Sequence, residues 1–229
     1  MIKFVDPKQI CNLGRLPISI LQNPMKKACS QLINNPKILV SQTELHKFYH
    51  KVKFNNLGSL YDIDASKEQT SFWNEPVGLI FQPWIHSRPI TRHFDFYFLR
   101  QISDKEISVK VQKLKDLVLS IQKKGYTPES YVDRKLGHIT GYFLEGDQTK
   151  RFYVVSGNHR VAVLAALFPD EPIPVILERE DFIKPRDKEN RNTFKTTYSL
   201  DNAHAWPAVK SRCVTVKQAK KIMNKYLEV

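Results

Sequence analysis

A five-residue stretch in the second half of the chain has the composition of a phosphate-binding turn. It consists of Ser156, Gly157, Asn158, His159 and Arg160, and it joins an apolar run to an alanine-rich one. The first N–H groups of a helix have no partner inside the helix, and the helix dipole adds partial positive charge there. A glycine turn that opens a helix is therefore suited to hold phosphate oxygens.

Each residue type in this phosphate-binding stretch has a role in that chemistry. Gly157 allows a positive φ or a close approach of phosphate to the backbone. Arg160 can reach two phosphate oxygens with its forked guanidinium, and His159 supplies a further donor or, when charged, a proton. Ser156 or Asn158 can cap the helix or contact the ligand. The alternative is a plain helix start with solvated polar side chains, because short glycine motifs often occur without function.

Regular elements on both sides would position this stretch. Two runs rich in β-forming residues, 139–144 and 152–155, flank a Gly-Asp turn and predict a hairpin. The second strand leads into the stretch, and residues 158–168 predict a helix that Pro169 ends. A short apolar run at 173–177 then predicts a buried strand.

The chain divides into three parts by pattern. Residues 1–90 contain recurring prolines and are expected to form an irregular segment packed on the core. Residues 91–180 form the patterned core, and residues 181–229 open with a charged, loop-like stretch and close with a helix. The fold class expected is α+β, with a small mixed sheet and packed helices.

Helices are predicted in all three parts. Short ones are expected near 25–33 and 43–50, and apolar residues at helical spacing predict one over 109–124 that ends at Gly125. The last helix, 215–227, begins with capping-box spacing. The lysines of the two long helices lie off the apolar stripes, so we expect them on solvent-exposed faces.

The run from Val154 to Leu177 resembles the box of the ParB/sulfiredoxin-like superfamily. That box consists of a strand, a Gly-x-[His/Arg]-Arg sequence, an alanine-rich helix and a short Ile-Pro-Val strand. Its matching residues here are Gly157, His159 and Arg160, and the resemblance covers roughly residues 95–180. It implies that the box holds the phosphates of a nucleoside triphosphate, ATP or CTP, with Mg²⁺ as the accompanying ion.

The departures from the family pattern limit what this resemblance implies. Asn158 stands where sulfiredoxins have their reactive cysteine, so that repair chemistry is not available. Ser156 replaces an aspartate of the free-serine kinases, and His159 replaces the first arginine of ParB partition proteins. No helix-turn-helix is recognisable after the box, although a DNA-partition protein would need one.

The resemblance also singles out residues 100–106. In this superfamily an acidic or polar segment before the first helix faces the box, and in its serine kinases a glutamate there acts as base. Asp104 and Glu106 match this segment and join His159 as catalytic candidates. A carboxylate there could orient Mg²⁺ or take a proton from an acceptor hydroxyl. The alternative is that both acids lie at a helix start because acids favour that end.

Beyond the box, the chain is similar to ParB-like proteins of bacterial glycan and secondary-metabolism gene clusters. The likeness rests on Gly-Ser-Leu-Tyr at 58–61, with aromatic residues upstream, and on Trp-Pro-Ala-Val at 206–209 followed by a helix. This resemblance extends over nearly the whole chain.

Composition favours an anionic partner. The 229 residues include 36 lysines and arginines against 23 acids, a net charge of +13. Such a charge suits nucleotides, nucleic acid or acidic surfaces, although it can also be a solubility bias. The scattered cysteines Cys11, Cys29 and Cys213 predict neither disulfides nor a zinc–cysteine site, so we expect a reducing, cytoplasmic compartment.

Two further classes of site are not expected. No stretch approaches the roughly 18 apolar residues of a membrane-spanning helix, so we expect no membrane partner. His86 and His93 do not have a recognised metal-ligand spacing, and the chain has no His-Glu-x-x-His, so we expect no metal centre in the protein itself.

Three functions remain open on the sequence. The first is a nucleotide-dependent phosphotransferase or NTP hydrolase acting on a small hydroxyl-bearing molecule. The second is a nucleic-acid-binding or nuclease-like protein. The third is a non-catalytic nucleotide-binding module in a biosynthetic or regulatory complex, with Phe72, Trp73 and Trp84 on an exposed partner surface. Nucleotide binding ranks first, and a kinase-like role ranks above DNA binding because no DNA-reading element is recognisable.

Overall fold

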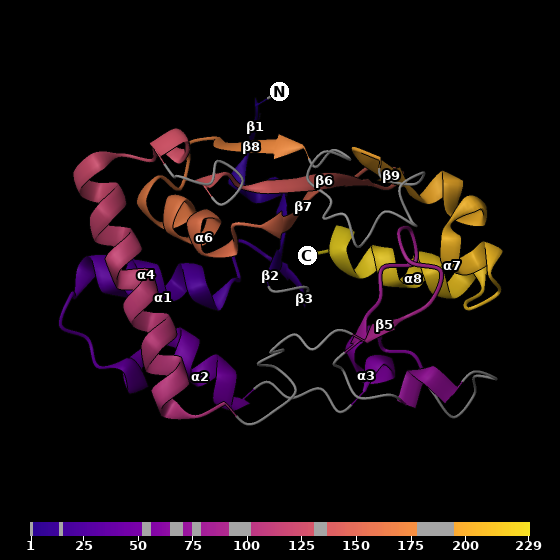
Figure 1. Ribbon diagram of the computed structural model, residues 1–229, viewed down its shortest axis with the longest axis horizontal. Helices are drawn as coiled ribbons and strands as arrows, with labels where there is room; N and C mark the ends of the chain where they lie inside the picture. The colour runs from indigo at the N-terminus through magenta and orange to yellow at the C-terminus, as the bar shows by residue number, and fades with distance from the viewer. Residues whose placement is uncertain are drawn as a thin grey trace.

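The computed structural model describes residues 2–13, 16–51, 56–64, 71–74, 79–91, 102–130, 137–177 and 195–229 (Figure 1). Within them the chain forms a mixed α+β fold, in agreement with the predicted class. The helices are α1 (Pro24–Asn34), α2 (Glu44–Lys51), α3 (Leu57–Tyr61), α4 (Asp104–Lys124), α6 (Asn158–Leu167), α7 (Pro207–Lys210) and α8 (Val216–Leu227). No helix among the described residues is long and apolar enough to cross a membrane.

A mixed sheet forms the centre of the fold. Its strands are β1 (Ile2–Val5), β2 (Ile10–Leu13), β3 (Leu16–Ser19), β6 (Thr140–Glu145), β7 (Lys150–Ser156), β8 (Ile173–Leu177) and β9 (Thr197–Ser199). The order is β1-β8-β6-β7-β2-β3, and β9 pairs with β6 beyond the end of the β6–β8 pairing. A separate ribbon pairs β4 (Leu79–Ile80) with β5 (Ile90–Thr91).

The secondary-structure elements predicted around residues 156–160 are confirmed. The hairpin is β6 and β7, which pair antiparallel, and the helix that follows is α6. The buried strand at 173–177 is β8, which runs parallel to β6. Helix α4 begins at Asp104, five residues before the predicted start, because Ser103 caps it ahead of the apolar stripe.

The N-terminal segment contributes more regular structure than its prolines indicated. The two short helices expected there are α1 and α2, and Pro24 occupies the first turn of α1, where a missing N–H costs nothing. Three strands, β1 to β3, were not foreseen. β1 pairs antiparallel with β8, and β2 pairs parallel with β7, so the segment forms part of the central sheet. The charged stretch at 181–192 lies outside the described residues.

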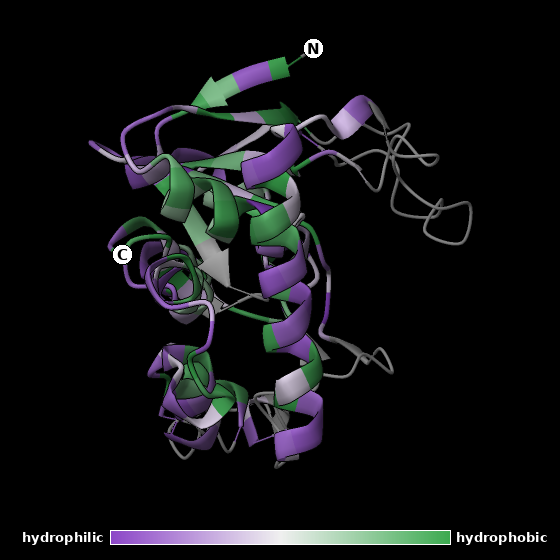
Figure 2. Cartoon of the chain, turned by 90° about the vertical axis from the view of Figure 1, so that its left-hand side faces the viewer, coloured by the Kyte–Doolittle hydropathy of each residue, from purple (hydrophilic) through white to green (hydrophobic). Residues whose placement is uncertain are grey.

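Helices cover the sheet in two groups. Figure 1 shows α1, α4 and α6 together on one side of the strands and α7 and α8 on the other. Tyr226 of α8 packs edge-on against Tyr153 of β7. Because neighbouring strand residues point to opposite faces, Phe152 and Val154 face away from α8, yet both are fully buried. In Figure 2 hydrophobic residues run through the strands and α6, whereas polar and apolar residues alternate along α4.

Trp73 and Trp84 are core residues. They are 0% and 1% exposed, respectively. Trp84 donates from its indole N–H to the Tyr142 hydroxyl at 3.1 Å, and its ring packs edge-on against Trp206. Trp206 of the late Trp-Pro sequence and Tyr226 of α8 therefore pack against Trp84, and neither Trp73 nor Trp84 forms an exposed partner surface.

Candidate functional site

The glycine turn before α6 has the geometry that the sequence analysis required. Gly157 is the N-cap residue of α6, with φ 95° and ψ 20°. Side chains strongly disfavour this left-handed conformation. A Cβ at this position would also lie 3.0 Å from both Cα and Cγ1 of Ile139. Only glycine lets the chain turn from β7 into α6 this closely against the strand beside it.

The N-cap residue of α6, Gly157, makes no side-chain hydrogen bond to the start of the helix. Ser156 is exposed and Asn158 is half-buried, and neither acts as the helix cap that the sequence analysis considered. The first turn also lacks acidic residues. No carboxylate or hydroxyl group of α6 itself therefore competes with an anion for the N–H groups at this end of the helix.

Arg160 lies beside the glycine turn. Its Nη1 donates to the carbonyl oxygen of His138 at 2.7 Å, and a Cβ placed on Gly157 would be 3.4 Å from the same nitrogen. The bond to His138 anchors the guanidinium between the start of β6 and the start of α6. A positive group is thus held at the end of α6 where the helix dipole is also positive.

The His159 side chain is partly buried, with its Nε2 atom inside the protein. Burial, together with the weaker effect of the positive charges of Lys110, Lys113 and Arg160, lowers the pKa of His159 from the ordinary 6.5 to about 4. Its Nε2 atom is buried and makes no hydrogen bond with the described residues. The imidazole is therefore uncharged at pH 7, so the expected role as a cationic proton donor does not fit this environment.

The lowered pKa of His159 predicts an acid-sensitive fold. Below pH 6.5 the unfolded chain binds a proton on this histidine that the folded chain does not bind until about pH 4. Stability is thus complete above pH 6.5 and falls as the pH falls toward 4. Between pH 7 and pH 5 we expect a loss of about 2 kcal/mol from this group. Urea unfolding at both pH values should show a smaller loss for His159→Gln, whose side chain does not titrate, and an equal loss in both proteins would contradict the assignment.

The charges around His159 come from two helices. Lys110 and Lys113 belong to α4, which packs against α6, and Arg160 belongs to α6 itself. We call the start of α6 together with these three cations and His159 the α6 site. The lysines expected on a solvent-exposed face of α4 therefore include two that contribute to the electrostatics of this site.

Glu106 lies on the face of α4 that carries the two lysines. Residues four and seven positions apart share a helix face, and Lys110 is about 6 Å along the axis from Glu106. The carboxylate also completes a capping box. Its Oε2 accepts from the Ser103 N–H at 3.0 Å and from the Ser103 hydroxyl at 2.9 Å. The local explanation for this acid is thus correct, and the helical repeat places it on the same face of α4 as Lys110 and Lys113.

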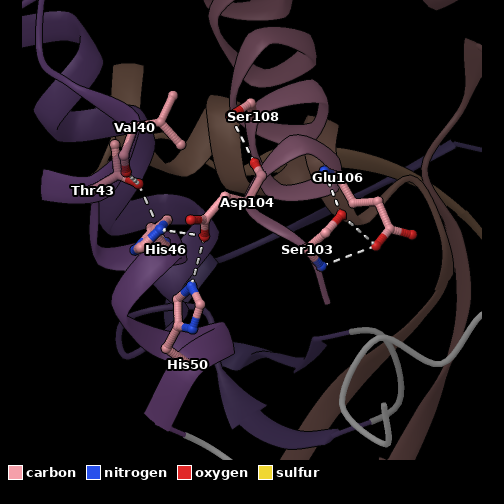
Figure 3. A network of polar contacts seen from close by, with 8 residues as sticks. All are labelled: Val40, Thr43, His46, His50, Ser103, Asp104, Glu106 and Ser108. Atoms are coloured by element: carbon pink, nitrogen blue, oxygen red, sulfur yellow. Dashed lines mark hydrogen bonds and ion pairs between the residues drawn. The ribbon is translucent and has the colours of Figure 1, made fainter. Parts of the chain in front are cut away.

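Asp104 points to the opposite side of α4, toward α2 (Figure 3). Its Oδ1 lies 3.0 Å from Nε2 of His46 and 2.9 Å from Nε2 of His50. Hydrogen bonds from His50 and then His46 lower the pKa of the Asp104 carboxyl. The structure therefore separates the two carboxylates that the sequence analysis grouped, and it brings Asp104 to a pair of histidines instead of to the α6 site.

The His46 and His50 pair was overlooked in the sequence. The two histidines are four residues apart inside a helix that was predicted, which places their side chains on one helix face. The spacing alone was enough to place the two histidines together. Their contact with Asp104 could not be predicted, because Asp104 is 58 residues from His46 in the sequence. His86 and His93 were the histidines compared with known metal-ligand spacings. His86 accepts a hydrogen bond from the backbone N–H of Gln82, and His93 lies outside the described residues.

The two buried cysteines, Cys11 and Cys29, are not reactive as thiolates. Burial raises the pKa of both the Cys11 and Cys29 thiols to about 12. Thiolate chemistry at neutral pH is therefore excluded at these two positions.

Comparisons with protein-family models, with curated proteins and with solved structures found no match to this chain.

Proposed function

We propose that this protein binds the phosphate groups of a nucleoside triphosphate at the α6 site. The observation that carries the proposal is the gathering of Arg160, Lys110 and Lys113 around the start of α6. The three cations give this end of α6 a positive local charge, to which the helix dipole adds. An anion of several negative charges is attracted by that charge and can accept from the helix N–H groups.

The order of elements supports a nucleotide as the anion. Strand β7, the Gly157 turn, α6 and β8 follow one another as strand, box, alanine-rich helix and Ile-Pro-Val strand do in the ParB/sulfiredoxin-like superfamily. Membership of that superfamily is part of this proposal, as is Mg²⁺ bound through the phosphates of the nucleotide.

Turnover of the nucleotide is the further step of the proposal, and Glu106 is the residue we assign to it. It is the carboxylate on the Lys110 side of α4, whereas Asp104 faces α2. A carboxylate next to bound phosphates could take a proton from a water molecule or from the hydroxyl of a small acceptor. The protein would then be a small-molecule kinase or an NTP hydrolase.

Neither of the other two functions has comparable support. The exposed partner surface of the binding-module hypothesis required Trp73 and Trp84 at the surface, and both are buried. Binding to nucleic acid rests on the net charge of +13, which predicts salt-sensitive affinity but no specific site.

A thermal-shift screen against ATP, CTP and inorganic triphosphate, with and without Mg²⁺, tests the proposal. A ligand that binds only the folded state raises the melting temperature by mass action. We expect Lys110→Gln and Lys113→Gln each to weaken nucleotide binding about tenfold, the effect of one charge-assisted contact. Lys123→Gln is the matched control, because it removes the same charge from α4 about 15 Å further along the helix. Equal nucleotide affinity in all three variants would contradict nucleotide binding at the α6 site.

The role of Glu106 can be separated from binding with one substitution. Glu106→Gln keeps a capping-box residue at this position of α4 but removes the base. Phosphate release measured at saturating nucleotide should fall by about 100-fold or more, the usual contribution of a general base, while the melting shift is kept. Unchanged turnover in this variant would contradict the role that we assign to Glu106.

A further inference from the structure

We propose that His46, His50 and Asp104 form a binding site for a divalent transition-metal ion between α2 and α4. The three side chains each offer one ligand atom, and these atoms all lie within 4.8 Å of one another. Figure 3 shows both imidazoles directed at the Asp104 carboxylate from the helix that faces it. Two imidazoles and one carboxylate, with two ligands from one helix turn, are a recurring ligand set for Zn²⁺ and related ions.

The spacing of the ligand atoms fits a metal ion. Metal–nitrogen and metal–oxygen bonds of about 2.0–2.1 Å place neighbouring ligand atoms about 2.9–3.4 Å apart, for octahedral and tetrahedral geometry respectively. The two Nε2 atoms lie 3.0 and 2.9 Å from Asp104 Oδ1. Both of these separations lie in the range for a shared metal ion, and the two Nε2 atoms lie within 4.8 Å of each other. A cation could therefore replace the two hydrogen-bonded protons after adjustment of the side chains.

The backbone around the site is already fixed by packing. On α2, Leu45 and Tyr49 are buried next to the two histidines, and on α4, Ile107 is fully buried one turn after Asp104. The turn before α2 is also ordered, because Thr43 Oγ1 accepts from the His46 N–H at 3.3 Å and donates to the Val40 carbonyl at 2.7 Å. The ligands thus come from two helices whose separation is set without the metal, which lowers the cost of ordering them on binding.

The ligand chemistry selects the ion. Imidazole nitrogen suits Zn²⁺, Co²⁺, Ni²⁺ and Fe²⁺, whereas Mg²⁺ and Ca²⁺ prefer oxygen ligands throughout. The Asp104 side chain is 75% exposed, and that of His50 is 43% exposed. Three protein ligands on a solvent-accessible face leave coordination positions for water, as in metal sites that bind or activate a small ligand.

This metal site is independent of the proposed nucleotide site. Asp104 and Glu106 leave α4 on opposite sides, so the three ligands lie away from the helix face of Lys110 and Lys113. Metal binding should therefore need no nucleotide, and nucleotide binding should not need this metal. The failure of one proposal would leave the other standing.

Titration of the full-length, untagged protein with Co²⁺ after chelator treatment tests the site without nucleotide. We expect one Co²⁺ per chain, with d–d absorption bands of nitrogen and oxygen ligands and no thiolate charge-transfer band. Zn²⁺ should displace Co²⁺, because imidazole and carboxylate ligands in tetrahedral geometry suit Zn²⁺. Asp104→Asn and His50→Gln should each weaken Co²⁺ binding by tenfold or more. Both positions are exposed, so the variants should retain the circular dichroism spectrum and melting temperature of the metal-free wild type.

The control variant is His204→Gln, which removes an exposed histidine from the C-terminal part of the chain. It should bind Co²⁺ as the wild type does. The proposal is overturned by a wild type that binds no Co²⁺ or Zn²⁺ in the micromolar range, which would leave a hydrogen-bonded His–Asp–His group only. Binding that persists at wild-type strength in Asp104→Asn and His50→Gln would overturn it equally.

Discussion

Replacing Gly141 with alanine should destabilise the protein by at least about 4 kcal/mol or prevent folding. A Cβ on Gly141 would lie 2.0 Å from the carbonyl oxygen of Tyr153 and 2.8 Å from the ring of Phe152. The oxygen belongs to the neighbouring strand, where β6 shifts register between Thr140 and Gly141, so no side-chain rotation removes the overlap. Relief requires β6 and β7 to separate, which would also displace the Gly157 turn at the end of β7.

The matched control for this prediction is Gly146→Ala. A Cβ there would lie 2.9 Å from Cδ1 of Leu227, the far end of a flexible side chain that can rotate. We expect a cost below about 1.5 kcal/mol for this variant. Urea unfolding of both variants provides the comparison, and equal free energies of unfolding would show that the strand contact at Gly141 does not limit the fold.

Arg160→Ala should reduce nucleotide affinity by about 100-fold or more. A forked guanidinium can make two charge-assisted hydrogen bonds to phosphate, and each such bond contributes about 1.5–3 kcal/mol. Loss of two bonds corresponds to at least about 100-fold in the dissociation constant. The substitution also removes the bond to the His138 carbonyl, so some loss of stability is expected as well.

Two further measurements separate the binding effect of Arg160 from its structural effect. Arg160→Lys keeps the charge but not the fork, so it should recover part of the affinity lost in Arg160→Ala. Arg212→Ala, at an exposed arginine, should leave affinity unchanged. A folded Arg160→Ala protein, judged by its circular dichroism and urea unfolding, that binds nucleotide as tightly as wild type would contradict the assignment.

Local signals were sufficient to predict the elements around the α6 site. The hairpin, α6 and β8 each follow from periodicity, glycine or proline within a short window, and so does α8 on the other side of the sheet. The start of α4 could have been placed correctly too, because Ser103 and Glu106 form a capping box that the sequence contains in plain form. The apolar stripe that was used for the prediction begins only later in the helix.

The N-terminal strands could not be predicted in the same way. Each of β1, β2 and β3 has four residues, too few for an alternating pattern to stand out among prolines. Their partners are distant in the chain, since Ile2 pairs with Ile176 and Ile10 with Phe152. Such strands are stabilised by pairing with residues far away in the sequence, and no local window contains those residues.

A local window of sequence also could not show which distant residues lie near residues 156–160. Periodicity classified Lys110 and Lys113 as surface lysines, because it cannot show which second helix packs beside them. It also joined Asp104 to Glu106 by sequence proximity, although two positions along a helix turn side chains to nearly opposite faces. The His46 and His50 pair became meaningful only when the fold placed Asp104 next to it.

The central claim, that a nucleoside triphosphate binds at the start of α6, is tested most directly by calorimetric titration of the wild-type protein. ATP, CTP and inorganic triphosphate should be titrated at two salt concentrations with Mg²⁺ present. We predict one molecule of at least one nucleotide per chain, weaker binding at the higher salt because the site is cationic, and competition by triphosphate. Absence of binding by all three compounds at low salt would contradict the claim.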